Sequence, residues 1–140
     1  MNFKILSQLL LLLLAMLPLS AWAGADEQSA PAAAATRFVT LLDAGTVDAA
    51  WQEFAPLARM IKSETQWQPL QKSLRTAYGP VEKRSMRGVT LQNRYAMLPD
   101  GQYAIVQFDT VFRNKRAAVE TIVLGQSQDS RWQVHDYIIN

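Results

Sequence analysis

Apolar and polar residues alternate along the C-terminal third of the chain in three consecutive segments. These segments have the two-residue period of half-buried β-strands and cover residues 102–112, 117–124 and 131–139. The linkers between them are too short for a crossover helix, so neighbouring strands must be antiparallel. Residues 81–94 predict a further strand ahead of them. The pattern therefore predicts a four-stranded antiparallel meander sheet.

Helical spacing dominates the segment before the sheet. A first predicted helix carries Phe38, Leu41 and Leu42 at positions i, i+3 and i+4. A second short helix is expected to bury Trp51 and Phe54. Short amphipathic helices of this kind need a partner surface, which the sheet can supply.

A third helix is predicted between a capping-box pattern at residues 63–66 and the stop signal formed by Gly79 and Pro80. Pro69 lies inside this segment, where it removes one hydrogen bond at a cost of roughly 3 kcal/mol, so a kink or a later start is expected. Two or three helices followed by a meander sheet define an α+β fold, with the helices on one face of the sheet.

The hairpin turns predict which side chains share a face of the sheet. If Asn114 and Lys115 form a two-residue loop, Val106 faces Val123 and Phe108 faces Thr121. Asp136 is the exception on the resulting apolar face and is expected at its rim. The predicted core face, which the helices should cover, comprises Ala104, Val106, Phe108, Thr110, Phe112, Val119, Thr121, Val123, Trp132, Val134 and Ile138.

The opposite face carries the candidate chemistry. The same register places Asp109 against Glu120 and Glu120 against His135, with Tyr137 nearby. Like charges in opposite positions destabilise a sheet, so we expect a counter-charge, a raised carboxyl pKa or a ligand there. Two carboxylates beside the only histidine could act as an acid/base pair. The alternative is a solvated face with neutralised charges, and a one-residue slip in register would remove the cluster.

The N-terminus has the features of a signal peptide. Lys4 precedes an apolar run over residues 5–17, and Ala21-Trp22-Ala23 forms an A-x-A cleavage site. The run is shorter than the about 20 residues that a transmembrane helix needs, so no stable membrane anchor is expected after cleavage. The sequence predicts cleavage after Ala23 and a periplasmic or secreted protein.

The remaining chain divides into two predicted parts. Residues 24–35 contain no large apolar side chain and are expected to form a flexible lead-in. Residues 36–140 have the length of a single domain with a core of its own.

Composition narrows the possible chemistry. The chain has no cysteine and one histidine, which excludes disulfides, thiolate ligands and the familiar zinc and copper sites. Its glycines form no phosphate-binding loop, and no cofactor or metal is predicted. Removing Lys4 lowers the formal net charge from +2 to +1, which argues against a nucleic-acid partner.

The tryptophans of the domain are predicted to be core residues rather than pocket residues. Trp51, Trp67 and Trp132 each lie on an apolar stripe. Truncating Trp132 to alanine is accordingly expected to cost roughly 3–5 kcal/mol.

Several segments of the domain carry a family resemblance. They include Trp51, residues 63–67, 99–103, 107–112 and 114–115, Ala118-Val119-Glu120-Thr121, and residues 132–134 and 137–139. Together they resemble the secreted bacterial family called domain of unknown function 4019 over about residues 36–139. The resemblance implies a single-domain exported protein with a nuclear-transport-factor-2-like or cystatin-like layout, and it implies no established activity.

The functional prediction is a non-enzymatic periplasmic module that binds a small molecule, a peptide or an envelope protein. The chain lacks a complete catalytic set, which favours binding over catalysis. One alternative is a small enzyme that uses Asp109, Glu120, His135 and Tyr137 as weak candidate site residues. Another alternative is a homodimer formed through one face of the sheet.

Overall fold

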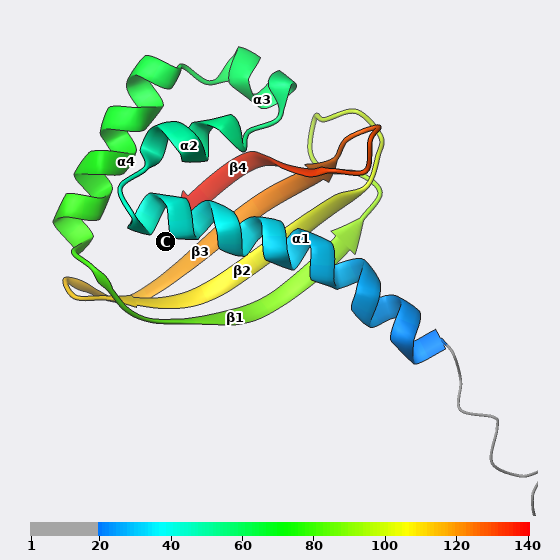
Figure 1. Ribbon diagram of the computed structural model, residues 1–140, viewed down its shortest axis with the longest axis horizontal. Helices are drawn as coiled ribbons and strands as arrows, with labels where there is room; N and C mark the ends of the chain where they lie inside the picture. Colours follow the sequence, from blue (N-terminus) through cyan, green and yellow to red (C-terminus); the bar gives the residue numbers. More distant parts are fainter. Residues whose placement is uncertain (1–19) are drawn as a thin grey trace, which may run out of the picture.

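The computed structural model describes the backbone of residues 20–140 and the side chains from residue 27 onward (Figure 1). In order along the chain its elements are α1 (Ser20–Asp43), α2 (Val47–Gln52), α3 (Pro56–Ile61), α4 (Glu64–Tyr78), β1 (Val81–Gln92), β2 (Tyr103–Phe112), β3 (Lys115–Gln126) and β4 (Trp132–Ile139). The strands form one antiparallel sheet in the order β1-β2-β3-β4. The predicted α+β class and the predicted meander are confirmed.

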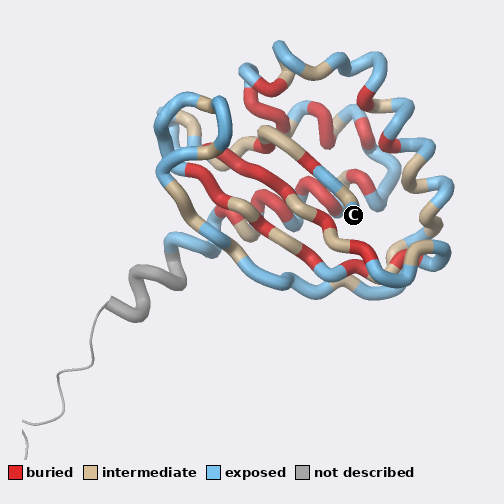
Figure 2. The backbone as a smooth tube through the Cα atoms, turned by 180° about the vertical axis from the view of Figure 1, so that it is seen from behind, coloured by how far each residue is buried: buried red, intermediate tan, exposed pale blue. Residues whose placement is uncertain are grey.

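The helices cover one face of the sheet. Helix α1 crosses this face and contacts all of its strands, while α2 and α4 pack against α1 (Figure 1). Buried backbone is concentrated in the middle of the sheet and along the facing side of the helices (Figure 2). The aromatic core lies between these layers, where the Phe54 ring centroid is 5.6 Å from Phe38 and 5.0 Å from Trp67. Trp51 and Trp67 are buried, as predicted.

Helix α1 is much longer than the sequence indicated. Residues 24–35, which were expected to form a flexible lead-in, lie within this helix. Their alanines have the highest helix propensity, and their small side chains allow close packing. Ala34 and Ala35 are buried in the core cluster, so the composition was wrongly interpreted as a sign of flexibility.

Most of the predicted signal peptide lies outside the residues that the structure describes. Its apolar run lies outside the described residues, and residues 20–23, which include the expected cleavage site, are described only as backbone of α1. Within residues 20–140, none of the helices combines the length and the apolar character that crossing a membrane requires.

The register between β2 and β3 differs by one residue from the prediction. Phe112 pairs with Lys115, so the loop residues are Arg113 and Asn114, and Val106 pairs with Ile122 instead of Val123. The loop is held there by the α4–β1 junction: the backbone N–H of Arg113 donates to the Pro80 carbonyl oxygen at 3.0 Å, and that of Asn114 to Tyr78 at 2.8 Å. Because side chains alternate, this slip reverses the faces of β3.

The predicted face of β2 is confirmed, whereas that of β3 is wrong. Every inward residue predicted on β2 is buried. On β3, Val119, Thr121 and Val123 lie on the face away from the helices; Val119 and Thr121 are partly buried there, and Val123 is completely buried. The residues of β3 that face the helices are Ala118, Glu120, Ile122 and Leu124.

Strand β4 contains a second irregularity. Val123 pairs with Asp136 and Leu124 with Val134, so His135 is the extra residue of a β-bulge. Beyond the bulge the alternation is reversed, and Tyr137 rather than the predicted Ile138 is buried against the helices. Asp136 forms an ion pair with Lys62 at 2.9 Å, at the edge of the sheet, consistent with its predicted position at the rim.

Candidate functional site

The structure separates the four residues of the predicted acid/base cluster. Asp109 lies on the open face, half exposed, and pairs with Arg87 at 2.6 Å. Glu120 is completely buried on the helix-covered face. Glu120 pairs with Ile139, four residues from His135 along β4, so the two are separated by roughly 13 Å of strand. Only Tyr137 meets Glu120, and the predicted Asp109–Glu120–His135 group does not form.

Glu120 instead lies at the centre of a buried polar network. Its Oε1 accepts hydrogen bonds from the Thr110 hydroxyl at 2.5 Å and from Arg84 Nε at 2.8 Å. Its Oε2 accepts from the Tyr137 hydroxyl at 2.5 Å and from Arg75 Nη2 at 3.3 Å. A carboxylate with this many donors is well satisfied in spite of its burial.

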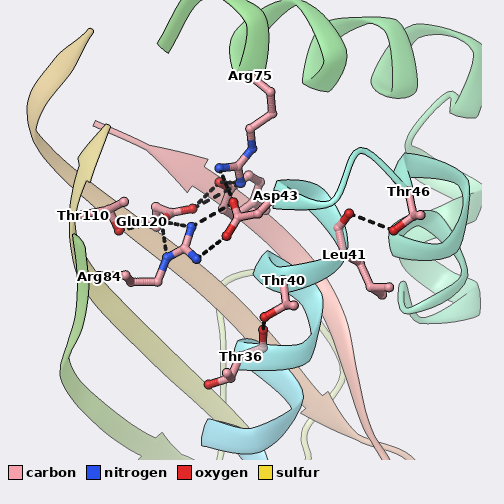
Figure 3. A network of polar contacts seen from close by, with 10 residues as sticks. Thr36, Thr40, Leu41, Asp43, Thr46, Arg75, Arg84, Thr110 and Glu120 are labelled. Atoms are coloured by element: carbon pink, nitrogen blue, oxygen red, sulfur yellow. Dashed lines mark hydrogen bonds and ion pairs between the residues drawn. The ribbon is translucent and has the colours of Figure 1, made fainter. Parts of the chain in front are cut away.

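Asp43 closes the network on the side of the helices. It accepts a hydrogen bond from Arg75 Nη1 at 2.8 Å and from Arg84 Nη1 at 2.5 Å (Figure 3). As the last residue of α1, its negative charge is opposed by the helix dipole, and the two arginines offset this cost. We call Asp43, Arg75, Arg84, Thr110, Glu120 and Tyr137 the Glu120 network.

The network joins elements that are distant in the sequence. Arg75 comes from the last turn of α4, and Arg84 comes from β1 at the position paired with Thr110 of β2. Arg75 Nη2 also donates to the Tyr137 hydroxyl of β4 at 2.8 Å. Two guanidinium groups therefore hold the end of α1 and the middle of the sheet together.

The surroundings fix the protonation states of this network. Burial alone would raise the pKa of Glu120, but the charge of Arg84 and the hydrogen bonds from Thr110 and Tyr137 lower it below its ordinary value. Burial and the charge of Glu120 raise the pKa of Tyr137 far above that of a free phenol. At neutral pH Glu120 is thus an anion and Tyr137 a neutral donor.

We expect the stability to depend on acid through Glu120. A lowered carboxyl pKa stabilises the fold above the unfolded value of 4.5, and this contribution is lost as the pH falls through the folded value. Urea midpoints should therefore change little between about pH 7 and pH 5 and then decline toward pH 3. The decline should be shallower in Glu120→Gln; an equal decline in both proteins would contradict this assignment.

A cleft of about 590 Å³ opens beside the network and is lined by two of its members, Asp43 and Arg75. Arg75 Nε is buried and has no hydrogen-bond partner within the described part of the protein. The remaining lining residues are Thr76, Gly79, Pro80 and Val81.

Two basic residues, Arg113 and Lys115, lie near the α4–β1 junction, which lines part of this cleft. A β-carbon on Gly79 would be 3.2 Å from Arg113 Cβ, and Lys115 Nζ is 5.5 Å from the centroid of the Tyr78 ring. Neither Arg113 nor Lys115 has a carboxylate within ion-pair distance among residues 27–140. The β2–β3 turn therefore adds unpaired positive charge beside the cleft. Over the same residues, the structure contains no group of three His, Asp or Glu side chains that could hold a metal ion.

The family of the chain follows from a comparison with family models. The model described as "Protein of unknown function (DUF4019)" matches residues 34–137. The chain belongs to this family. The match confirms the resemblance found in the sequence, and no curated protein and no solved structure matches the chain.

In this DUF4019 protein, His135 lies away from the network, beside Gly125. Its ring centroid is 5.8 Å from that of Tyr103, and burial lowers its pKa. A β-carbon on Gly125 would be 2.6 Å from His135 Nε2 and 3.1 Å from a Tyr103 ring atom. His135 is thus a packed residue, and its Nδ1 has no hydrogen-bond partner within the described residues.

This close packing gives a direct test of where His135 lies. Gly125→Ala should cost about 1–3 kcal/mol, because the new methyl group displaces the imidazole ring. A double-mutant cycle with His135→Ala, measured by urea denaturation, should recover most of this loss. A loss that is the same in both backgrounds would place His135 elsewhere.

Proposed function

We propose that this DUF4019 protein is an exported, non-enzymatic binding module that takes up a small anionic molecule in the cleft above Arg75. The observation that carries the proposal is that Arg75 lines a cleft of about 590 Å³ and has a buried Nε–H for which the described residues supply no hydrogen-bond partner. This volume is in the range of small-molecule sites, roughly 300–1,000 Å³. A carboxylate or phosphate group is the natural partner of a guanidinium group.

The charge around the cleft favours an anion. Among the described residues that line the cleft, Asp43 alone is acidic, and two guanidinium groups already neutralise it. Arg113 and Lys115, near the α4–β1 junction, contribute positive charge without an ion-pair partner among the described residues. Positive charge near a cleft attracts anions and raises their association rate.

The protonation states support binding over catalysis. A general acid or base works best when its pKa is close to the working pH. Glu120 has a lowered pKa and Tyr137 a raised one, so neither group exchanges a proton near neutral pH. His135, which could do so, is not among the residues that line this cleft. Export rests on the predicted signal peptide and its A-x-A site.

Two measurements test this proposal. Native mass spectrometry of protein purified from a periplasmic extract should detect a bound anion. In addition, citrate and inorganic phosphate, added separately to ¹⁵N-labelled protein, should shift the Arg75 Nε–H resonance, whereas glycerol should not. Binding should weaken with increasing salt, because the charges near the cleft are screened.

A pair of lysine variants provides the control. Lys115→Gln removes a charge near the cleft, whereas Lys83→Gln removes the same charge from the strand position opposite Val111 on the open face. The first variant should weaken the binding of citrate or phosphate, and the second should leave it unchanged. Equal effects of both variants, or no shift of the Arg75 resonance with any anion, would refute the proposal.

A further inference from the structure

Two more clefts lie at the opposite end of the helix-covered face, and both are lined by Trp132 and Ala30. The first has a volume of about 430 Å³ and extends toward α2. The second has a volume of about 500 Å³ and extends toward the ends of β1 and β3, including Leu91 and Gln126. Trp132 therefore stands between two hollows, one on each side of the N-terminal half of α1.

Among the three tryptophans whose side chains the structure describes, Trp132 is the one that lies outside the core cluster. Trp51 and Trp67 are 4% and 8% exposed, whereas Trp132 is only partly buried at the start of β4. A large aromatic side chain that remains partly accessible can offer its ring to a ligand and its indole N–H as a donor. Trp132 was predicted to be a core residue; it is partly buried and packs against the core cluster from outside.

Polar, planar side chains surround this tryptophan. Among the described residues that line the two clefts, Leu91 is the single large aliphatic one. On the α2 side, Arg37 and Glu53 form an ion pair at 2.7 Å, which places a donor group next to an acceptor group. The side-chain amides that line the clefts belong to Gln52, Gln102, Gln126 and Gln133.

This combination fits a sugar ring. A pyranose has apolar C–H faces, which can stack on an indole ring, and a rim of hydroxyl groups. Side-chain amides, a carboxylate and a guanidinium group can each donate to or accept from such hydroxyls. An apolar peptide would need hydrophobic pockets for its side chains, and the described lining offers Leu91 as its one large aliphatic residue.

We propose that the Trp132 clefts bind a saccharide, with one sugar ring stacked on the Trp132 indole and its hydroxyls bonded to the surrounding glutamines. Both volumes lie in the range of small-molecule sites, roughly 300–1,000 Å³. The two clefts meet at one aromatic residue, so they can accept two consecutive rings of a glycan. This site is separate from the cleft above Arg75, and neither proposal depends on the other.

The test uses the indole N–H resonances of ¹⁵N-labelled protein. The full chain would be titrated with N,N′-diacetylchitobiose, cellobiose and maltose, each to about 20 mM, where even millimolar affinity is detectable. At least one disaccharide should shift the Trp132 indole resonance and leave those of Trp51 and Trp67 in place. The absence of any Trp132 shift with all three disaccharides would overturn the proposal.

Three variants guard against indirect effects. Trp132→Ala should weaken the binding of the active disaccharide at least roughly tenfold, whereas Trp132→Phe, which keeps an aromatic face, should weaken it less. Gln133→Ala, which leaves the indole in place, should also weaken binding, and it serves if the first variant unfolds. If Gln133→Ala and Trp132→Phe bind the disaccharide with unchanged affinity while the disaccharide shifts the Arg75 Nε–H resonance, the sugar binds in the cleft beside Arg75. That result would overturn the proposal for the Trp132 clefts.

Discussion

Glu120→Gln should lower the free energy of unfolding by about 3–5 kcal/mol. A loss of this size is typical when one partner of a buried ion pair is removed and the other charge stays buried. The amide has nearly the same shape as the carboxylate but no charge. It can accept at only one of its two former oxygen positions, whereas Glu120 accepts from four side chains. Arg75 and Arg84 would then share Asp43 as their one remaining anion in the network.

A matched substitution shows whether burial is the cause. Asp109→Asn removes the same charge from a carboxylate that is about half exposed and pairs with the equally exposed Arg87. Solvent screens this surface pair, so its loss should change the stability far less than the loss of the buried Glu120 charge. Urea denaturation of both variants and the parent measures the difference. Similar losses in the two variants would contradict the central position of Glu120.

Phe54→Ala should have an effect of comparable size, about 3–5 kcal/mol, because it leaves a cavity in the aromatic core. Phe54 is completely buried, and its ring centroid lies 5.4 Å from Trp51 and 5.0 Å from Trp67. Its backbone also forms an isolated parallel bridge with Val134, in which the N–H of the next residue, Ala55, donates to the Val134 carbonyl oxygen at 2.8 Å. Urea midpoints with unchanged slopes would report the loss as a change in stability.

Trp132→Ala serves as the comparison for this prediction. Although tryptophan is larger than phenylalanine, Trp132 is only partly buried, so its truncation removes less contact with the core. We expect a smaller loss than for Phe54→Ala, below the roughly 3–5 kcal/mol that full burial would imply. A larger loss in Trp132→Ala would mean that Trp132 belongs to the core and is not available to a ligand.

The architecture follows from local patterns, because alternation and helical spacing are properties of neighbouring residues. The meander and the inward face of β2 were predictable for this reason. The inward face of β3 was not, since the position of the turn at Arg113 and Asn114 depends on hydrogen bonds to Pro80 and Tyr78. Such tertiary contacts shift the register by one residue and leave no local signal in the sequence.

The network was only partly predictable. Glu120 and Tyr137 were candidates, but Asp43, Arg75 and Arg84 were missed because isolated charges usually indicate a solvated surface. Arg84 in particular fits the pattern of a charged edge strand. One signal was available: Arg75 lies eight residues after Trp67 and four after Gln71, on the same stripe of α4, and both of those residues are buried.

The protonation state of Glu120 tests the account most directly. The carboxyl carbon of Glu120 can be followed by ¹³C NMR in labelled protein while the pH is lowered from neutral. We predict a carboxylate that stays ionised through neutral and mildly acidic pH, with a midpoint below the ordinary value of 4.5. A midpoint above that value would mean that Glu120 is a protonated buried acid, which would contradict the ionised network and favour acid/base chemistry over binding.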